Sequence, residues 1–350
     1  MILWAIRLSV VAGLAVYVFG VLPTRQLVES LTSIAPAHVL SAWLLLLCGH
    51  YIGAWLQKAL FDRQGLSLSA SLIFRINLGV HFYGLFVPGG VLTSSALRWY
   101  RLAGRTGRPV EIAAASILNR VIEVLTCSAL AFFGWLIAGR TGGAAVGLVL
   151  GLLLAAMVST YCCLSSRTVA AGAARRLRRL SRSRPRWRRL GLKLVASFRR
   201  ASASPWRLHL TLISLSVGRV LVWALALYFL ATGLSLGLSL VAVVWVHSAT
   251  AVLTLLPISI GGLGVREASY VALLRSYDVA AVMAVSLGLL QFAISILNGV
   301  VGGLIELIDV LSGGRMASGV RTATAMSTGL HRLPPDDFEE RQRAGTRSVT

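Results

Sequence analysis

GAAVGLVLGLLLAAMVSTYCCL, residues 143–164, is an apolar run without a single charged side chain. At a rise of about 1.5 Å per residue, a helix of this length crosses the roughly 30 Å hydrocarbon core of a bilayer. Comparable runs fill most of the chain, and two further apolar stretches, 69–92 and 257–275, are interrupted by proline and glycine. We therefore predict seven membrane spans: 2–22, 38–58, 110–138, 143–164, 206–231, 236–256 and 279–310.

The composition of the 350 residues supports this prediction. Hydrophobic residues make up 56% of the chain, charged residues only 13%, and the mean hydropathy is +0.77. A soluble domain carries about 25% charged residues, and its core could not absorb this excess of apolar side chains. We expect an all-α, polytopic membrane helix bundle of about 7–8 spans, without a sizeable soluble catalytic domain.

The net charge of +22 is concentrated in one segment. Residues 166–205 contain 13 basic residues and no acidic one. Such a run is also compatible with nucleic-acid binding, but short basic loops mainly fix the orientation of membrane proteins by staying in the cytoplasm. We predict that 166–205 is a cytoplasmic linker of a protein in the inner (plasma) membrane and that nucleic acid is not a partner.

The linker separates two halves of similar organisation, 1–165 and 206–311. Positive flanks place both ends of 69–92 in the cytoplasm, so this segment is predicted to be a re-entrant hairpin broken at Pro88, Gly89 and Gly90. Each half reads span, span, Pro-Gly-Gly break, arginine, span, which indicates an internal repeat. To keep the predicted disordered tail, 312–350, in the cytoplasm, 279–310 has to form two short helices, broken near Asn298-Gly299.

Charged residues inside the predicted spans are candidates for function. Arg120 and Glu123 are three residues apart on one helix face, and Arg219 lies near the middle of 206–231. A charge at this depth is costly and needs partners within the bundle. An ion pair that only holds the helices together and a place in a substrate pathway are both open for Arg120 and Glu123, whereas the pathway is favoured for Arg219.

The second break, LPISIGGLGVRE at 256–267, is the other candidate site. Its glycines permit an unwound backbone, and free amides beside Arg266 suit an anionic group such as phosphate. Glu267 could balance Arg266 or carry a proton. The alternative is a tight cytoplasmic turn with a surface Arg-Glu pair. The candidate residues of this segment are Pro257, Gly261, Gly262, Gly264, Arg266 and Glu267.

Other polar residues give no sign of catalysis. His81 and His247 have no second ligand at metal-binding spacing, so we interpret them as satisfied core residues. The four cysteines lie inside predicted spans and are interpreted in the same way. No hydrolase elbow, zinc motif or phosphate loop is present. We expect no enzymatic activity, no metal and no cofactor.

Two motifs resemble a known family. Residues 86–123, which run from Phe86-Val87-Pro88-Gly89-Gly90 through Arg98 to Arg120-Val121, and residues 256–267 are similar to two parts of a signature of the lysylphosphatidylglycerol synthase transmembrane region, also called the flippase-like domain family. The resemblance covers about residues 1–310. It implies an integral membrane lipid translocator or a lipid-binding scaffold. Aminoacylation is not expected of residues 1–350, because only a tail follows residue 310.

The resemblance also gives the candidate residues roles. Arg98 and Arg266, one at each break, are expected to hold the phosphate of an anionic lipid between the halves, with Arg120, Glu123 and Arg219 along its route. Movement is expected to be passive or gradient-driven. The alternative is an accessory subunit that binds lipid and presents it to a separate glycosyl- or aminoacyl-transferase, with the basic linker as the docking surface.

Overall fold

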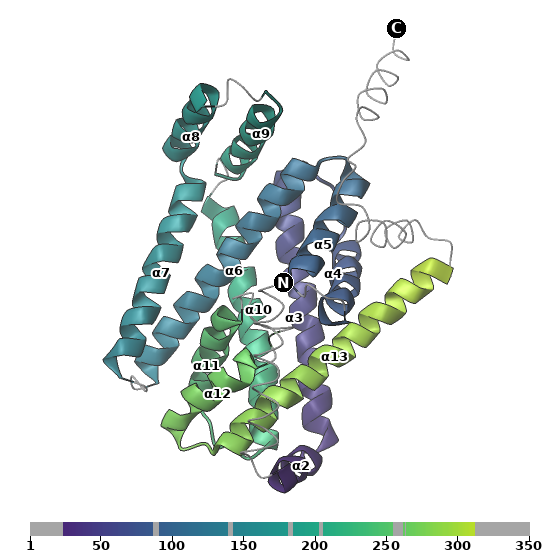
Figure 1. Ribbon diagram of the computed structural model, residues 1–350, viewed down its shortest axis with the longest axis vertical. Helices are drawn as coiled ribbons and strands as arrows, with labels where there is room; N and C mark the ends of the chain where they lie inside the picture. Colours follow the sequence, from purple (N-terminus) through teal and green to yellow (C-terminus); the bar gives the residue numbers. More distant parts are fainter. Residues whose placement is uncertain are drawn as a thin grey trace, which may run out of the picture. The chain divides into compact units, whose positions relative to one another are not determined.

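The computed structural model describes residues 24–86, 91–138, 143–180, 185–202, 206–254, 262 and 264–311. All regular structure in these ranges is helical, which confirms the all-α prediction (Figure 1). The chain divides into Met1–Ile305 and Glu306–Thr350, and of the second unit only the helical residues 306–311 are described. The predicted span 2–22 and the predicted tail lie outside the described residues.

The helices fall into three groups along the chain (Figure 1). Before the linker they are α2 (Thr24–Ser33), α3 (Pro36–Arg63), α4 (Ala70–Phe86), α5 (Val91–Thr106), α6 (Pro109–Ile137) and α7 (Ala144–Ser165). The linker contains α8 (Arg167–Leu180) and α9 (Pro185–Ser202). After it come α10 (Trp206–Gly233), α11 (Leu240–Leu253), α12 (Val265–Leu274) with a 3₁₀ turn (Arg275–Tyr277), and α13 (Ala281–Leu311).

Five of the described helices are long and apolar enough to cross a membrane, namely α3, α6, α7, α10 and α13. The prediction of a full span at 236–256 is wrong. There α11 begins only after Ser239, whose side chain accepts a hydrogen bond from the Ala242 amide, and it ends at Leu253. Its 14 residues extend over about 21 Å, too short for a bilayer core of about 30 Å.

The prediction of two short helices within 279–310 is also wrong, because α13 is one continuous helix of 31 residues. The two corrections have a common cause. When α11 and α12 form a second hairpin that does not cross, a single crossing by α13 is enough to bring residue 311 to the cytoplasmic side that its basic tail favours.

Two hairpins of short helices interrupt the set of long ones. In the first, α4 packs against α5, and in the second, α11 packs against α12. The returning limb of the first hairpin extends to Thr106, well beyond the predicted 69–92. The helices end and restart around residues 87–90 and 255–261, so Pro88, Gly89, Gly90, Pro257 and Gly261 themselves lie outside the described residues.

The two halves repeat one another in detail. The long helix α10 begins and ends 170 residues after α3, and α11 begins 170 residues after α4. The connecting turns match too: the Leu66 amide donates to Phe61 O and the Leu236 amide to Ala231 O, each at 3.0 Å. Ser69 then caps α4 as Ser239 caps α11. These pairs of residues share the same offset, so the repeat extends to the individual hydrogen bonds.

The packing of α3 against α10 shows how the repeats are related. Gly49 of α3 faces Trp223 so closely that an added Cβ would overlap the indole, and a Cβ at Gly53 would lie 3.1 Å from Arg219 Cδ. The offset of 170 makes Gly49 equivalent to Arg219 and Gly53 equivalent to Trp223. One contact therefore becomes the other under a pseudo-two-fold rotation, and the two helices are antiparallel. This is the arrangement of inverted repeats.

The linker is not the loop that its charge suggests, because most of it is helical. The C-terminal end of α9 is held against the long helices: Gln64 Nε2 donates to the carbonyl of the buried Ser197 at 3.0 Å. Arg200 of α9 also pairs with Glu111 at the start of α6, at 3.5 Å. The linker is thereby connected to the helix that carries Arg120 and Glu123.

Candidate functional site

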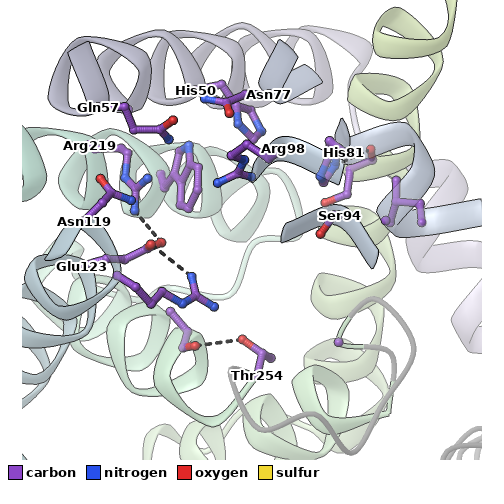
Figure 2. A pocket seen from close by; sticks show the side chains of 18 of the residues that line it. His50, Gln57, Asn77, His81, Ser94, Arg98, Asn119, Glu123, Arg219 and Thr254 are labelled. Atoms are coloured by element: carbon purple, nitrogen blue, oxygen red, sulfur yellow. Dashed lines mark hydrogen bonds and ion pairs between the residues drawn. The ribbon is translucent and has the colours of Figure 1, made fainter. Parts of the chain in front are cut away.

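A cavity of about 320 Å³ lies where the two repeats meet. Figure 2 shows polar side chains from several helices converging on it. The helices α3, α4, α5, α6, α10, α11, α12 and α13 all contribute to its lining, as does Gly262. The polar side chains that line it are His50, Gln57, Asn77, His81, Ser94, Arg98, Asn119, Arg120, Glu123, Arg219, Thr254, Arg266 and Ser295.

The structure brings together the four arginines singled out in the sequence. Arg98 comes from α5, Arg120 from α6, Arg219 from α10 and Arg266 from α12, and all four line the cavity. Arg219 is 13 residues from the start of the 28-residue α10 and so lies near mid-membrane. Guanidinium groups stay charged in proteins and offer several N–H donors, so the cavity wall is strongly cationic.

Glu123 is the only acidic residue among the described residues that line the cavity, and it contacts two of the arginines. Its carboxylate accepts a hydrogen bond from Arg120 Nη1 at 3.0 Å and forms an ion pair with Arg219 Nη2 at 2.5 Å (Figure 2). The Arg219 guanidinium also stacks over the Trp223 ring, with 4.8 Å between Cζ and the ring centroid. The predicted ion pair is therefore present and its residues line the cavity, whereas their place in a substrate pathway stays a prediction.

The second break holds Arg266 at the cavity and turns Glu267 away from it. Glu267 is fully buried, and its Oε2 accepts the Gly264 amide at 2.6 Å, which caps α12. The alternative of a surface Arg-Glu pair is therefore wrong, and Glu267 is not among the residues that line the cavity. Gly262, at φ +83°, is among them, and a Cβ there would lie 3.1 Å from Arg266 Nη2.

Three carboxamides that the sequence did not single out also line the cavity. The side-chain oxygens of Gln57, Asn77 and Asn119 are buried, and none has a hydrogen-bond partner among the described residues. The buried Nε atoms of Arg98 and Arg219 likewise have no hydrogen-bond partner among the described residues. Because buried polar groups are normally paired, these atoms indicate a site that is completed by a polar ligand or by water. The carboxamides are identified as site residues only by their place beside the arginines, and this place is known only from the folded structure.

A smaller cavity of about 190 Å³ adjoins the first and shares His50, His81, Trp223 and Arg266 with it. His81 lines both cavities, and its Nε2 lies 3.2 Å from Ser295 O. His247 lines the smaller one, and neither of its ring nitrogens has a hydrogen-bond partner among the described residues. His247 is buried as predicted, but the prediction that its ring nitrogens are satisfied is wrong among the described residues.

These groups suit the binding of an anion in a membrane. Within the described ranges, no three His, Cys, Asp or Glu side chains are placed to hold a metal ion. The sequence model of the family named lysylphosphatidylglycerol synthase transmembrane region matches residues 4–303. The chain belongs to this family. No curated protein matches the chain significantly.

The match to the lysylphosphatidylglycerol synthase transmembrane region family spans the segments that surround the cavity. The matched residues include both hairpins, both long antiparallel helices and every residue that lines the cavity. This agrees with the resemblance of 86–123 and 256–267, and it establishes a multi-pass membrane protein with a lipid-related function.

Proposed function

We propose that this chain translocates a lipid with an anionic, phosphate-bearing headgroup across the inner (plasma) membrane. The observation that carries the proposal is the cavity between two inverted repeats, which is lined by four arginines, one of them halfway along the spanning helix α10. Charged groups at this depth are expensive and mark substrate pathways in transporters. Substrate sites between inverted repeats, at broken helices, are a recurring transporter design.

The headgroup would enter the cavity while its acyl or prenyl tails stay in the bilayer. Arg98 and Arg266 belong to different repeats, and each follows one of the two breaks, so a phosphate held between them contacts both repeats. Arginine suits this role because its planar guanidinium can bond two phosphate oxygens at once. The proposal involves no covalent step and no cofactor. The lipid moves passively or is driven by a gradient.

The experiment is translocation in proteoliposomes. A fluorescent phosphatidylglycerol or phosphatidate is placed in both leaflets, and the fraction quenched by an impermeant reductant measures movement. We expect the purified chain to accelerate movement and Arg98→Gln to slow it at least tenfold. Arg275→Gln is the matched control, because Arg275 is exposed and is not among the residues that line the cavity. A broad panel of anionic lipids without acceleration would overturn the proposal.

A lipid-presenting accessory subunit is the second candidate, favoured by the basic helices α8 and α9. The anchoring of α9 by Gln64 and Arg200 gives the linker a fixed place on α3 and α6 from which a separate transferase could dock. This candidate predicts that a glycosyl- or aminoacyl-transferase co-purifies with the chain. It also predicts that the transferase is lost when the arginines between 175 and 189 are replaced by glutamine, while lipid binding is retained.

A further inference from the structure

We propose that the headgroup taken by this cavity carries at least two negative charges, as a diphosphate or a phosphomonoester does. The inference rests on the proposed function and narrows its substrate class. It ranks a singly charged phosphodiester below a phosphomonoester or a diphosphate. The observation that carries it is a charge count at the cavity wall.

Among the described residues, four guanidinium groups and one carboxylate line the cavity, so the formal charge of its lining is three positive. Glu123 offsets one charge and is shared by Arg120 and Arg219. Even if Glu267, buried at the start of α12, is counted against Arg266, two positive charges remain. Because guanidinium groups do not lose their protons, the excess cannot be removed by titration.

No other acidic residue of the first unit can supply the missing charge. Three of the remaining four are engaged elsewhere: Glu29 with Arg25, Asp62 with Lys58, and Glu111 with Arg200. The fourth, Asp278, is exposed, and the stretches before residue 306 that are not described contain no Asp or Glu. Within residues 1–305, the positive excess is therefore a property of the sequence as well as of the described geometry.

The size of this excess selects the ligand. Uncompensated charge within a membrane is unfavourable, so a ligand that neutralises more of it is attracted more strongly by the arginines. A phosphodiester brings one negative charge and leaves at least one guanidinium uncompensated. A phosphomonoester brings about 1.5–2 negative charges near neutral pH, and a diphosphate brings more. Each further charge-assisted hydrogen bond strengthens binding roughly ten- to a hundredfold.

The test is a headgroup series on constant tails. The full chain is placed in nanodiscs of zwitterionic phosphatidylcholine and titrated with dioleoyl phosphatidylglycerol, phosphatidate and diacylglycerol diphosphate. We expect the diphosphate to bind at least tenfold more tightly than phosphatidylglycerol. Arg98→Gln should reduce this preference at least tenfold, and Arg275→Gln should leave it unchanged. A thermal melt checks that Arg98→Gln leaves the protein folded.

The binding assay tests this inference, and the translocation assay tests the proposed function on which it rests. Equal or tighter binding of phosphatidylglycerol, or a preference that survives Arg98→Gln, overturns the charge inference even when lipids are translocated. Preferential binding of the diphosphate without translocation of any lipid supports the charge inference and overturns the proposed function. Inorganic diphosphate is the remaining arm: if it binds as tightly as its lipid, the ligand is a free anion, and the assignment to a lipid headgroup is overturned.

Discussion

Replacing Glu123 by glutamine tests the electrostatics of the cavity most simply. The change keeps the shape of the side chain but removes the carboxylate that Arg120 and Arg219 share. The Arg219 side chain is only 7% exposed, whereas that of Arg120 is 44% exposed. Loss of Glu123 therefore leaves a buried charge at Arg219 and a largely solvated one at Arg120.

The expected loss in the free energy of unfolding follows from this difference in exposure. Removing one partner of a buried ion pair costs about 3–5 kcal/mol, and we expect the lower end because the pair faces a cavity with room for water. The exposed Arg120 pair is worth about 0–1 kcal/mol, so Arg120→Gln should be nearly neutral. Arg219→Gln should lie between the two, because Glu123 keeps Arg120 as its partner. Glu123→Gln combined with Arg219→Gln should cost less than Glu123→Gln alone, because the buried charge that Glu123 compensates at Arg219 is then absent too.

The assay is reversible unfolding in mixed micelles, with the free energy of unfolding measured for the wild type, the three single variants and the double variant. The coupling between Glu123 and Arg219 is the departure of the double variant from additivity. Two results would refute the reasoning: a double variant that costs the sum of its parts, or an Arg120→Gln variant as unstable as Glu123→Gln.

Three further predictions follow from the geometry. Gly49→Ala should destabilise the protein by about 1–3 kcal/mol, because its Cβ would overlap the Trp223 indole, and a thermal melt equal to wild type would contradict the close packing of α3 and α10. Arg266→Lys should weaken lipid binding about ten- to a hundredfold in a nanodisc titration, since lysine lacks the two-pronged contact, whereas unchanged binding would make Arg266 only a topological anchor. In a cysteine-free background, Arg105→Cys should be shielded from an impermeant thiol reagent added outside and Asp278→Cys should be labelled, because inverted repeats put the two hairpins on opposite sides; labelling of both positions would rule out the inverted arrangement.

The main features of the fold could be predicted from the sequence because they depend on composition. An uninterrupted apolar run such as 143–164 has few alternatives to a membrane helix, and α7 follows it closely. The apolar run 236–256 misled the prediction for the same reason: hydropathy does not register that Ser239 caps a helix and that Pro257 disfavours its continuation. The number of crossings therefore depended on two local signals weaker than the hydrophobic pattern.

The candidate site was predictable where it depends on charge. Arg219 attracts notice in any apolar helix, because its cost there requires an explanation. Gln57 and Asn77 carry no such signal, since an isolated carboxamide is common in membrane helices and acquires meaning only from neighbours on other helices. Glu267 shows the opposite failure: it stands next to Arg266 in the sequence, yet its carboxylate is used to cap α12.

The central claim is that the arginine cavity holds the phosphate of a lipid, and lipid that co-purifies with the chain tests it most directly. Mass spectrometry of lipids extracted from the purified protein should show a phosphate-bearing lipid enriched over its abundance in the membrane. The enrichment should be lost in the double variant Arg98→Gln and Arg266→Gln at unchanged yield and melting temperature. A neutral or cationic lipid enriched instead, or a phosphate-bearing lipid retained equally by the double variant, would contradict the claim.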